Sequence, residues 1–150
     1  MSHWKNKDLL LGILVLASTG TVAVAASVIG VPQPPCAGAR SATRAFTIIG
    51  DLDGYNGSRR QGGAGPSLTV QDCDTVVINF TNRDVQAHGL AVDFYAVNGL
   101  EVLGGDSAKV QFLAYKPGDF RVFCNIVCSI HSSMQHATLM VECAPGPGCV

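Results

Sequence analysis

Charged residues are scarce in this chain. Asp, Glu, Lys and Arg together make up 14% of its 150 residues, and the formal net charge is −1. The sequence contains neither a long run of Lys and Arg nor an acidic tail. These absences exclude a polybasic nucleic-acid surface and a disordered acidic segment, so nucleic acid is not an expected partner.

Internal repeats and heptad patterns are also missing. At 150 residues the chain has room for one compact domain and a short appendage, which excludes a two-domain catalytic machine. The 17 Gly and 7 Pro, together with the few charged helix formers, favour turns and strands over helices. The composition therefore predicts an all-β body.

One long uncharged stretch stands out, over residues 9–29. As a helix it would span about 31 Å, enough to cross the hydrocarbon core of a bilayer. Lys5 and Lys7 precede it, whereas no charge follows it until Arg40. The positive-inside tendency then predicts a cytoplasmic tail (1–8), a single membrane anchor (9–30) and an extracytoplasmic remainder of the chain in the cell membrane.

A cleaved signal peptide is the alternative for this stretch, because Ala23-Val24-Ala25 forms an A-x-A cleavage pattern. Both interpretations export the rest of the chain, and an exported domain is permitted disulfides. Residues 31–42 contain Pro32, Pro34 and Pro35 and are expected to form a stiff tether.

The exported domain is expected over residues 43–150 and contains short apolar runs between turn signals. Such a series of strands predicts a β-sandwich or barrel of Greek-key type. Residues 51–66, rich in Gly, Asp and Asn, are expected to form a solvated loop. The expected strands are 45–49, 68–70, 75–81, 89–94, 109–113, 120–124 and 137–142.

Metal-binding side chains concentrate in one short segment. Cys124, Cys128, His131 and Met134 fall within eleven residues of one another. Strand alternation over residues 120–124 points Cys124 inward, and the following loop can fold the other three back around it. His88, which follows the strand 75–81, supplies a second imidazole, and soft sulfur with imidazole is a ligand set for copper.

Two other interpretations use the same cysteines. Cys124 and Cys128 can form a structural disulfide, or they can bind zinc together with His131 and His136. A zinc site would leave both Met134 and His88 unexplained. Copper is therefore the favoured interpretation.

At these residues the sequence resembles the cupredoxin domain of cytochrome c oxidase subunit II and, more distantly, that of nitrous oxide reductase. The resemblance runs from about residue 68 to residue 142. It includes Gly118 six residues before Cys124, an Asp-Val element followed by His88-Gly89, and Cys-x3-Cys followed by His-x2-Met. It implies an all-β, cupredoxin-like Greek-key sandwich or barrel with one N-terminal transmembrane helix.

The resemblance also implies a binuclear CuA centre. Cys124 and Cys128 would bridge two copper ions, and His88 and His131 would bind one ion each. Met134 would be a weak axial ligand of one copper, and the backbone carbonyl of Ile126 would approach the other.

Two loop lengths depart from that family. Only Ser129 and Ile130 separate Cys128 from His131, where the family pattern has three residues. The element from Asp84 to His88 is one residue longer than the family's Asp-Val-x-His. A mononuclear blue or red copper site therefore stays open as an alternative.

By resemblance, the chain would carry electrons into a terminal oxidase of the respiratory chain. Its donor would be an external cytochrome c or small copper protein, and its partner a heme-copper catalytic subunit or another membrane redox protein. The chain has no Cys-x2-Cys-His heme motif, so catalysis would belong to the partner. A copper-delivery protein and a purely structural exported domain are the other candidates.

Four cysteines lie outside the copper segment and are expected to form two disulfides. The expected disulfides join Cys73 to Cys143 and Cys36 to Cys149, although the sequence permits three different pairings of these four cysteines.

From residue 31 onward, eight Lys and Arg stand against ten Asp and Glu, a net charge of −2. Partner docking is therefore expected to be weakly charged and to use apolar residues such as Leu90 and Ile130.

Overall fold

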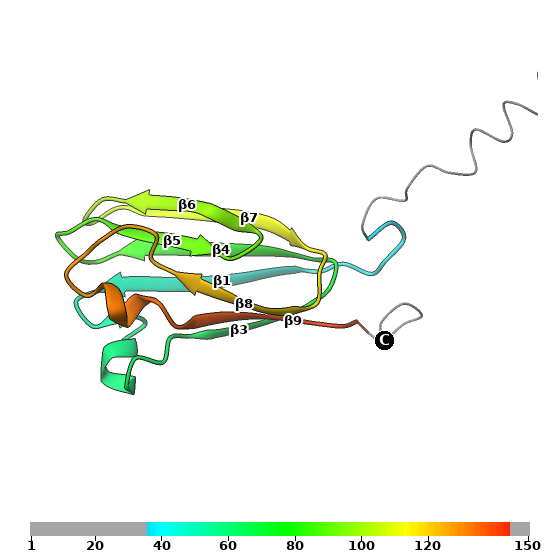
Figure 1. Ribbon diagram of the computed structural model, residues 1–150. Coiled ribbons are helices and arrows are strands. Elements are labelled where there is room, and N and C mark those ends of the chain that lie inside the picture. The colour runs from blue at the N-terminus through cyan, green and yellow to red at the C-terminus, as the bar shows by residue number, and fades with distance from the viewer. Residues whose placement is uncertain (1–35, 145–150) are drawn as a thin grey trace, which may run out of the picture. The chain divides into compact units, whose positions relative to one another are not determined.

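The computed structural model describes residues 36–144, which form two β-sheets packed against each other (Figure 1). The first sheet has the order β2-β1-β4-β7 and the second β3-β9-β8-β5-β6. The strands are β1 (Thr43–Asp51), β2 (Gly54–Tyr55), β3 (Ser67–Gln71), β4 (Asp74–Asn82), β5 (His88–Val92), β6 (Ala96–Val102), β7 (Ser107–Ala114), β8 (Gly118–Phe123) and β9 (Ala137–Glu142). Two short 3-10 helices, η1 (Ser58–Gln61) and η2 (His131–Met134), complete the described elements.

Between residues 36 and 144 no helix has the length and apolar character needed to cross a membrane. The predicted anchor (9–30) lies outside the described residues. The first strand, β1, begins at Thr43.

Apolar side chains alternate along β4, so that one face of this strand is buried in the core. Val76, Ile78 and Phe80 are fully buried, while Asn79 between them is exposed. The buried side chains meet those of the opposite sheet, such as Leu90 and Val122, in one hydrophobic core. Removing each large apolar side chain from water contributes about 2 kcal/mol.

All seven expected strands are present. The sequence did not predict β6, whose Asn98-Gly99 pair resembles a turn signal, or the two-residue β2. The expectation of a solvated loop over residues 51–66 is wrong, because this segment contains β2 and η1 and buries Tyr55 and Ser58.

Strand directions bring several connections to one end of the domain, called here the His88 end. β1 and β4 run parallel and both finish there, with Gly50 opposite Asn82. β8 finishes there as well, and β5 begins there at His88. The chain segments around residues 82–88 and 123–137 therefore meet, although they are far apart in sequence.

The disulfide arrangement differs from the expected pairing. Cys36 is bonded to Cys73, with their Cα atoms 5.3 Å apart. The reason is the parallel pairing of β1 with β4, because the residues that precede two parallel strands lie at the same end of a sheet. Cys143 is also disulfide-bonded and follows β9 at this end, whereas Cys149 lies outside the described residues.

Asp74, the first residue of β4, links this strand to residues at the ends of β1 and β3 near this disulfide. Its carboxylate accepts hydrogen bonds from Ala42 N–H (2.8 Å), Gln71 N–H (3.1 Å) and Arg44 Nε (3.0 Å). Burial raises the pKa of Asp74, but these three donors outweigh burial and bring the pKa below its ordinary value.

A carboxyl group with a lowered pKa stabilises the fold above its unfolded pKa and loses that effect as pH falls through its folded pKa. Asp74→Asn should therefore reduce the free energy of unfolding by about 1 kcal/mol at pH 7. The difference from wild type should shrink below about pH 4. Chemical unfolding of the full chain at pH 7 and pH 3 measures this. Asp119→Asn, at an exposed position on β8, is the control, and an equal loss at both pH values would contradict the assignment.

Candidate metal centre

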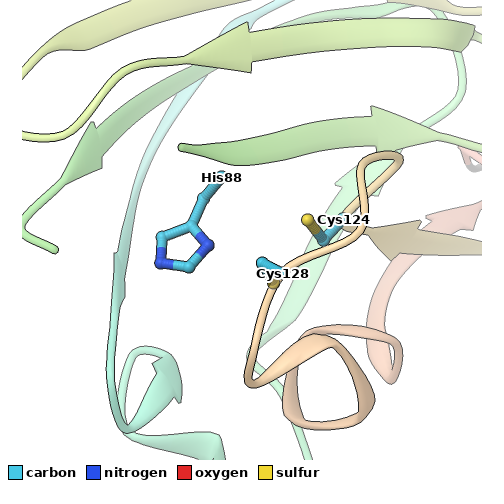
Figure 2. Close-up of side chains that lie close together, drawn as sticks. All are labelled: His88, Cys124 and Cys128. Carbon is cyan, nitrogen blue, oxygen red and sulfur yellow. The ribbon is translucent and has the colours of Figure 1, made fainter. Parts of the chain in front are cut away.

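Three predicted ligands meet at the His88 end. One ligand atom from each of His88, Cys124 and Cys128 lies within 4.8 Å of the other two (Figure 2). His88 begins β5, and the two cysteines lie in the connection between β8 and η2. The long-range convergence predicted from the sequence is therefore present for these residues.

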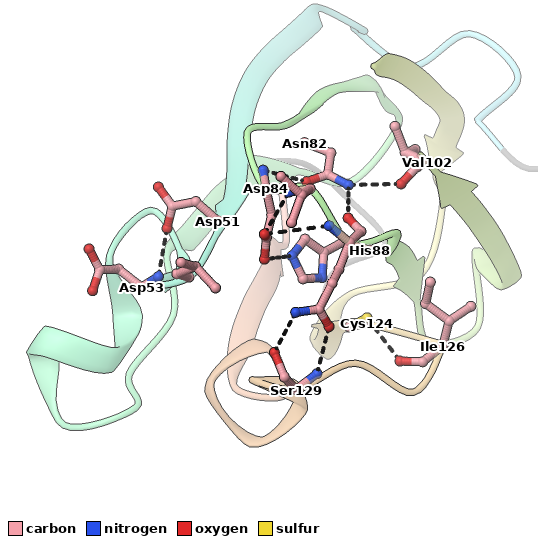
Figure 3. Close-up of polar contacts among 12 residues, drawn as sticks. Asp51, Asp53, Asn82, Asp84, His88, Val102, Cys124, Ile126 and Ser129 are labelled. Atoms are coloured by element: carbon pink, nitrogen blue, oxygen red, sulfur yellow. Dashed lines mark hydrogen bonds and ion pairs between the residues drawn. The ribbon is translucent and has the colours of Figure 1, made fainter. Parts of the chain in front are cut away.

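The imidazole of His88 is fully buried and held by a carboxylate. Its Nε2 lies 3.0 Å from Asp84 Oδ2 (Figure 3). A carboxylate favours a proton on Nε2 and leaves Nδ1 without one, which is the arrangement of many metal-binding histidines. Within residues 36–144, Nδ1 is the one buried side-chain nitrogen or oxygen that lacks a hydrogen-bond partner.

Asp84 is itself fixed by its own turn. Burial raises its pKa, but hydrogen bonds from Val85 N–H and Gln86 N–H and the contact with His88 outweigh burial and lower it. Asp84 therefore favours the carboxylate form, which is the form that accepts a hydrogen bond from His88.

Asn82 organises this turn through three hydrogen bonds. Its Oδ1 accepts Asp84 N–H at 2.9 Å, and its Nδ2 donates to Gln86 O at 2.7 Å and to Val102 O at 2.9 Å (Figure 3). Asn82 is fully buried. Neither Asn82 nor Asp84 was predicted from the sequence as a supporting residue, although Asx residues two apart at a strand end are a turn signal.

The Cys124 thiol lies in a close-fitting environment just past β8. Gly89 N–H donates to its Sγ at 3.2 Å, and the thiol donates to Ile126 O at 3.2 Å. The Ile126 carbonyl, which was predicted to approach a copper ion, therefore lies next to this sulfur. A Cβ at Gly89 would lie 2.1 Å from Asn125 Oδ1 and 3.0 Å from Asn125 N, so a larger residue here would force Asn125 to shift.

Tyr55 packs against the centre. It is 1% exposed, and its hydroxyl donates a hydrogen bond to Gly89 O. Burial, followed by the proximity of Cys124 and Cys128, raises the pKa of Tyr55 far above its ordinary value. Tyr55 therefore stays neutral and holds the Gly89 backbone beside Cys124.

Cys128 is half-buried and, like Cys124, is a free thiol. Burial and the neighbouring Cys124 raise the pKa of Cys128 to about 11. A metal ion that binds here must therefore displace a proton.

The other two predicted side-chain ligands sit in η2. His131 is partly exposed and does not belong to the group within 4.8 Å, and its Nδ1 lies 3.5 Å from Gln135 Nε2. Met134 is fully buried, and its methyl end approaches Gly50. Met134 O accepts Cys124 N–H at 2.9 Å, which ties η2 to the cysteine loop.

The donor set fits a soft metal ion. Two free thiols beside a buried imidazole nitrogen with no hydrogen-bond partner are suitable ligands for copper. The alternative of a Cys124–Cys128 disulfide is wrong, since both thiols are free. The zinc alternative loses support because His136 is exposed. Among the described residues, neither His131 nor His136 lies in the group formed by His88 and the two cysteines.

The expected contact surface also changes. Leu90 and Ile130 are buried, at 0% and 7% exposure, and belong to the hydrophobic core rather than to an exposed surface. Val85 and Val127, which lie in the two ligand loops, are 93% and 94% exposed. These two valines are the apolar side chains that the ligand loops present to solvent.

No family model matches the chain. Two curated relatives, both cytochrome c oxidase subunit 2 from Thermus thermophilus, are 31% identical over 67 residues, which is 45% of this chain. The chain spans 48% of the first relative's length and 39% of the second's.

Among solved structures, a copper nitrite reductase from Nitrosomonas europaea matches with a TM-score of 0.58 at 19% identity, covering 69% of this chain and 42% of that one. A multicopper oxidase matches with a TM-score of 0.55 at 18% identity, covering 67% and 42%. The described residues therefore form a cupredoxin-like domain, and the sequence resembles cytochrome c oxidase subunit II.

Proposed function

We propose that this chain is a copper electron-transfer protein of the subunit II type, with His88, Cys124 and Cys128 as its principal ligands. The observation that supports this most strongly is the buried, unpartnered Nδ1 of His88 beside two free thiols. A buried polar atom without a partner is costly unless a ligand satisfies it. Copper would satisfy it, and copper, when bound, accepts and releases one electron at a time.

The surrounding residues are suited to that role because they hold the ligands still. Asp84 fixes the imidazole, Gly89 N–H donates to the Cys124 sulfur, and the buried Tyr55 hydroxyl holds Gly89 O. Ligands that do not move between two oxidation states keep reorganisation small, and the hydrogen bond to sulfur tunes the potential.

A binuclear CuA centre would use His131, Met134 and the Ile126 carbonyl in addition to the principal ligands. The position of Ile126 O next to the Cys124 thiol supports this proposal. A mononuclear centre is the second candidate, favoured by the shortened Cys128–His131 loop and by the absence of His131 from the described three-residue group.

The proposed partners follow from the resemblance. The donor is an external cytochrome c or small copper protein, and the acceptor is the heme-copper catalytic subunit of a terminal oxidase or another membrane redox protein. The proposed location is the cell membrane, with an N-terminal anchor over residues 9–30 and the copper domain outside the cytoplasm.

The direct test counts metal and electrons. The full chain, in detergent with its free thiols reduced, is loaded with copper and titrated with a one-electron reductant. Two coppers per chain sharing one reversible electron support the binuclear proposal, and one copper supports the mononuclear one. Copper that passes rapidly and completely to a chelator would indicate a delivery protein, and no binding at all would contradict the proposed function.

The exposed valines predict where a donor docks. Val127→Asp should slow bimolecular electron transfer from a reduced cytochrome c by about tenfold, because an apolar contact is replaced by a charge. Stopped-flow mixing measures the rate. Val97→Asp, at a position 57% exposed on β6, is the matched control, and equal rates for the two variants would contradict docking at Val127.

A further inference from the structure

Two hydrogen bonds join the loops that carry the ligand side chains. Gln86 Nε2 donates to Ser129 Oγ at 3.0 Å, and Ser129 N–H donates to Gln86 Oε1 at 3.3 Å (Figure 3). Gln86 lies between Asp84 and His88, and Ser129 directly follows Cys128. One glutamine side chain therefore links the His88 loop to the Cys128 loop through both ends of its amide.

The backbone of Gln86 is held in place independently of this bridge. Its carbonyl accepts Asn82 Nδ2 at 2.7 Å, and its N–H donates to Asp84 Oδ1 at 3.4 Å. Asn82 is fully buried and bonded to Val102 as well. The Gln86 side chain therefore extends from a fixed base and restrains Ser129 more than Ser129 restrains it.

The Cys128 loop buries few side chains, although Ile130 N–H donates to the Cys128 thiol and His131 N–H donates to Cys128 O at 3.2 Å. Val127 projects into solvent, Cys128 is half-buried, and Ser129 is exposed, before the chain is buried again at Ile130. Packing alone gives the segment before Ile130 few constraints. The bridge to Gln86 supplies one at the residue next to the Cys128 thiol.

The two bridged residues also sit in the two loops whose lengths depart from the resembled family. Gln86 lies in the longer loop, and Ser129 lies in the shorter one. We infer that Gln86 is a positioning residue that holds Ser129 and thereby keeps the Cys128 thiol opposite the His88 imidazole. This inference rests on the proposed function, because it concerns where a metal ligand is held.

The bridge predicts an asymmetry between variants. Gln86→Ala removes both hydrogen bonds, whereas Ser129→Ala removes only the one to Oγ and leaves the backbone donor. Copper loss from the full chain to bathocuproine disulfonate should be about tenfold faster in Gln86→Ala and about threefold faster in Ser129→Ala. The double variant should match Gln86→Ala, since both changes break the same bridge.

Spectra and a conservative variant separate positioning from general stability. Gln86→Ala should broaden and shift the thiolate-to-copper absorption band, whereas Ser129→Thr, which keeps both groups, should retain the parent band. Gln111→Ala on β7 and Ser67→Ala on β3, both at exposed positions, are the matched controls. The inference would be overturned if Gln86→Ala matched Gln111→Ala in its absorption band and its rate of copper loss. It would also be overturned if the effects of Gln86→Ala and Ser129→Ala on that rate were additive in the double variant.

A metal-free measurement keeps this test distinct from that of the proposed function. In the reduced, copper-free chain, hydrogen exchange at the Ser129 amide reports its bond to Gln86 Oε1. Faster exchange in Gln86→Ala supports the bridge, and unchanged exchange overturns it. This result holds even if the parent chain binds no copper, an outcome that would instead contradict the proposed function.

Discussion

Replacing Cys124 with serine is expected to abolish the thiolate-to-copper absorption of the copper-loaded chain. Cys124 is 1% exposed, and its thiol is held by Gly89 N–H and the Ile126 carbonyl, so it occupies a fixed position in the group with His88 and Cys128. A serine hydroxyl fits the same space but is a poor ligand for copper. Absorption spectra and copper counts of the loaded variant measure the effect.

Comparison with Cys128→Ser shows whether one thiolate or both bind copper. If the two thiolates bridge a pair of metal ions, both variants lose the paired centre. If Cys124 alone binds a single copper, Cys128→Ser keeps a one-copper spectrum. A Cys124→Ser variant with unchanged spectrum and stoichiometry would contradict the proposed ligand set.

Asn82→Ala is expected to be the most destabilising change among the supporting residues. It removes three hydrogen bonds from a fully buried position and leaves Gln86 O, Val102 O and Asp84 N–H without this partner. The expected loss is about 3 kcal/mol in the free energy of unfolding. Chemical unfolding of the metal-free chain measures it, so the result does not depend on copper.

Asn79→Ala is the matched control for this change. Asn79 lies on the same strand, but its side chain is exposed and donates one long hydrogen bond, to Phe46 O at 3.4 Å. The free energy of unfolding of Asn79→Ala should lie within about 0.5 kcal/mol of the wild-type value. Equal losses for the two variants would show that Asn82 does not organise the His88 turn.

Much of the fold could be predicted from residue pattern because period-two alternation is local. Val76, Ile78 and Phe80 alternate with more exposed positions and identify β4 without any knowledge of its neighbours. The thiols and imidazole of the site were also recognisable, since Cys124, Cys128 and His88 are of the residue types that copper requires. Their convergence followed from placing His88 and Cys124 at strand ends.

The remaining features depend on long-range pairing, which a single sequence does not contain. The Cys36–Cys73 disulfide follows from the parallel pairing of β1 with β4. Tyr55 lies in a segment whose Gly, Asp and Asn content resembles a solvated loop, yet it is buried because β2 pairs with β1 and the Tyr55 hydroxyl reaches Gly89. The Gln86–Ser129 bridge joins residues 43 positions apart.

X-ray absorption at the copper edge of the loaded full chain is the sharpest test of the proposed copper centre, because it identifies the atoms bound to the metal. We expect sulfur at about 2.2–2.3 Å together with imidazole nitrogen at about 2.0 Å, by analogy with soft-ligand metal sites. The nitrogen contribution should fall in His88→Ala, and the sulfur contribution should fall in Cys124→Ser. A spectrum that contains only oxygen and nitrogen neighbours, unchanged in both variants, would contradict the proposed centre.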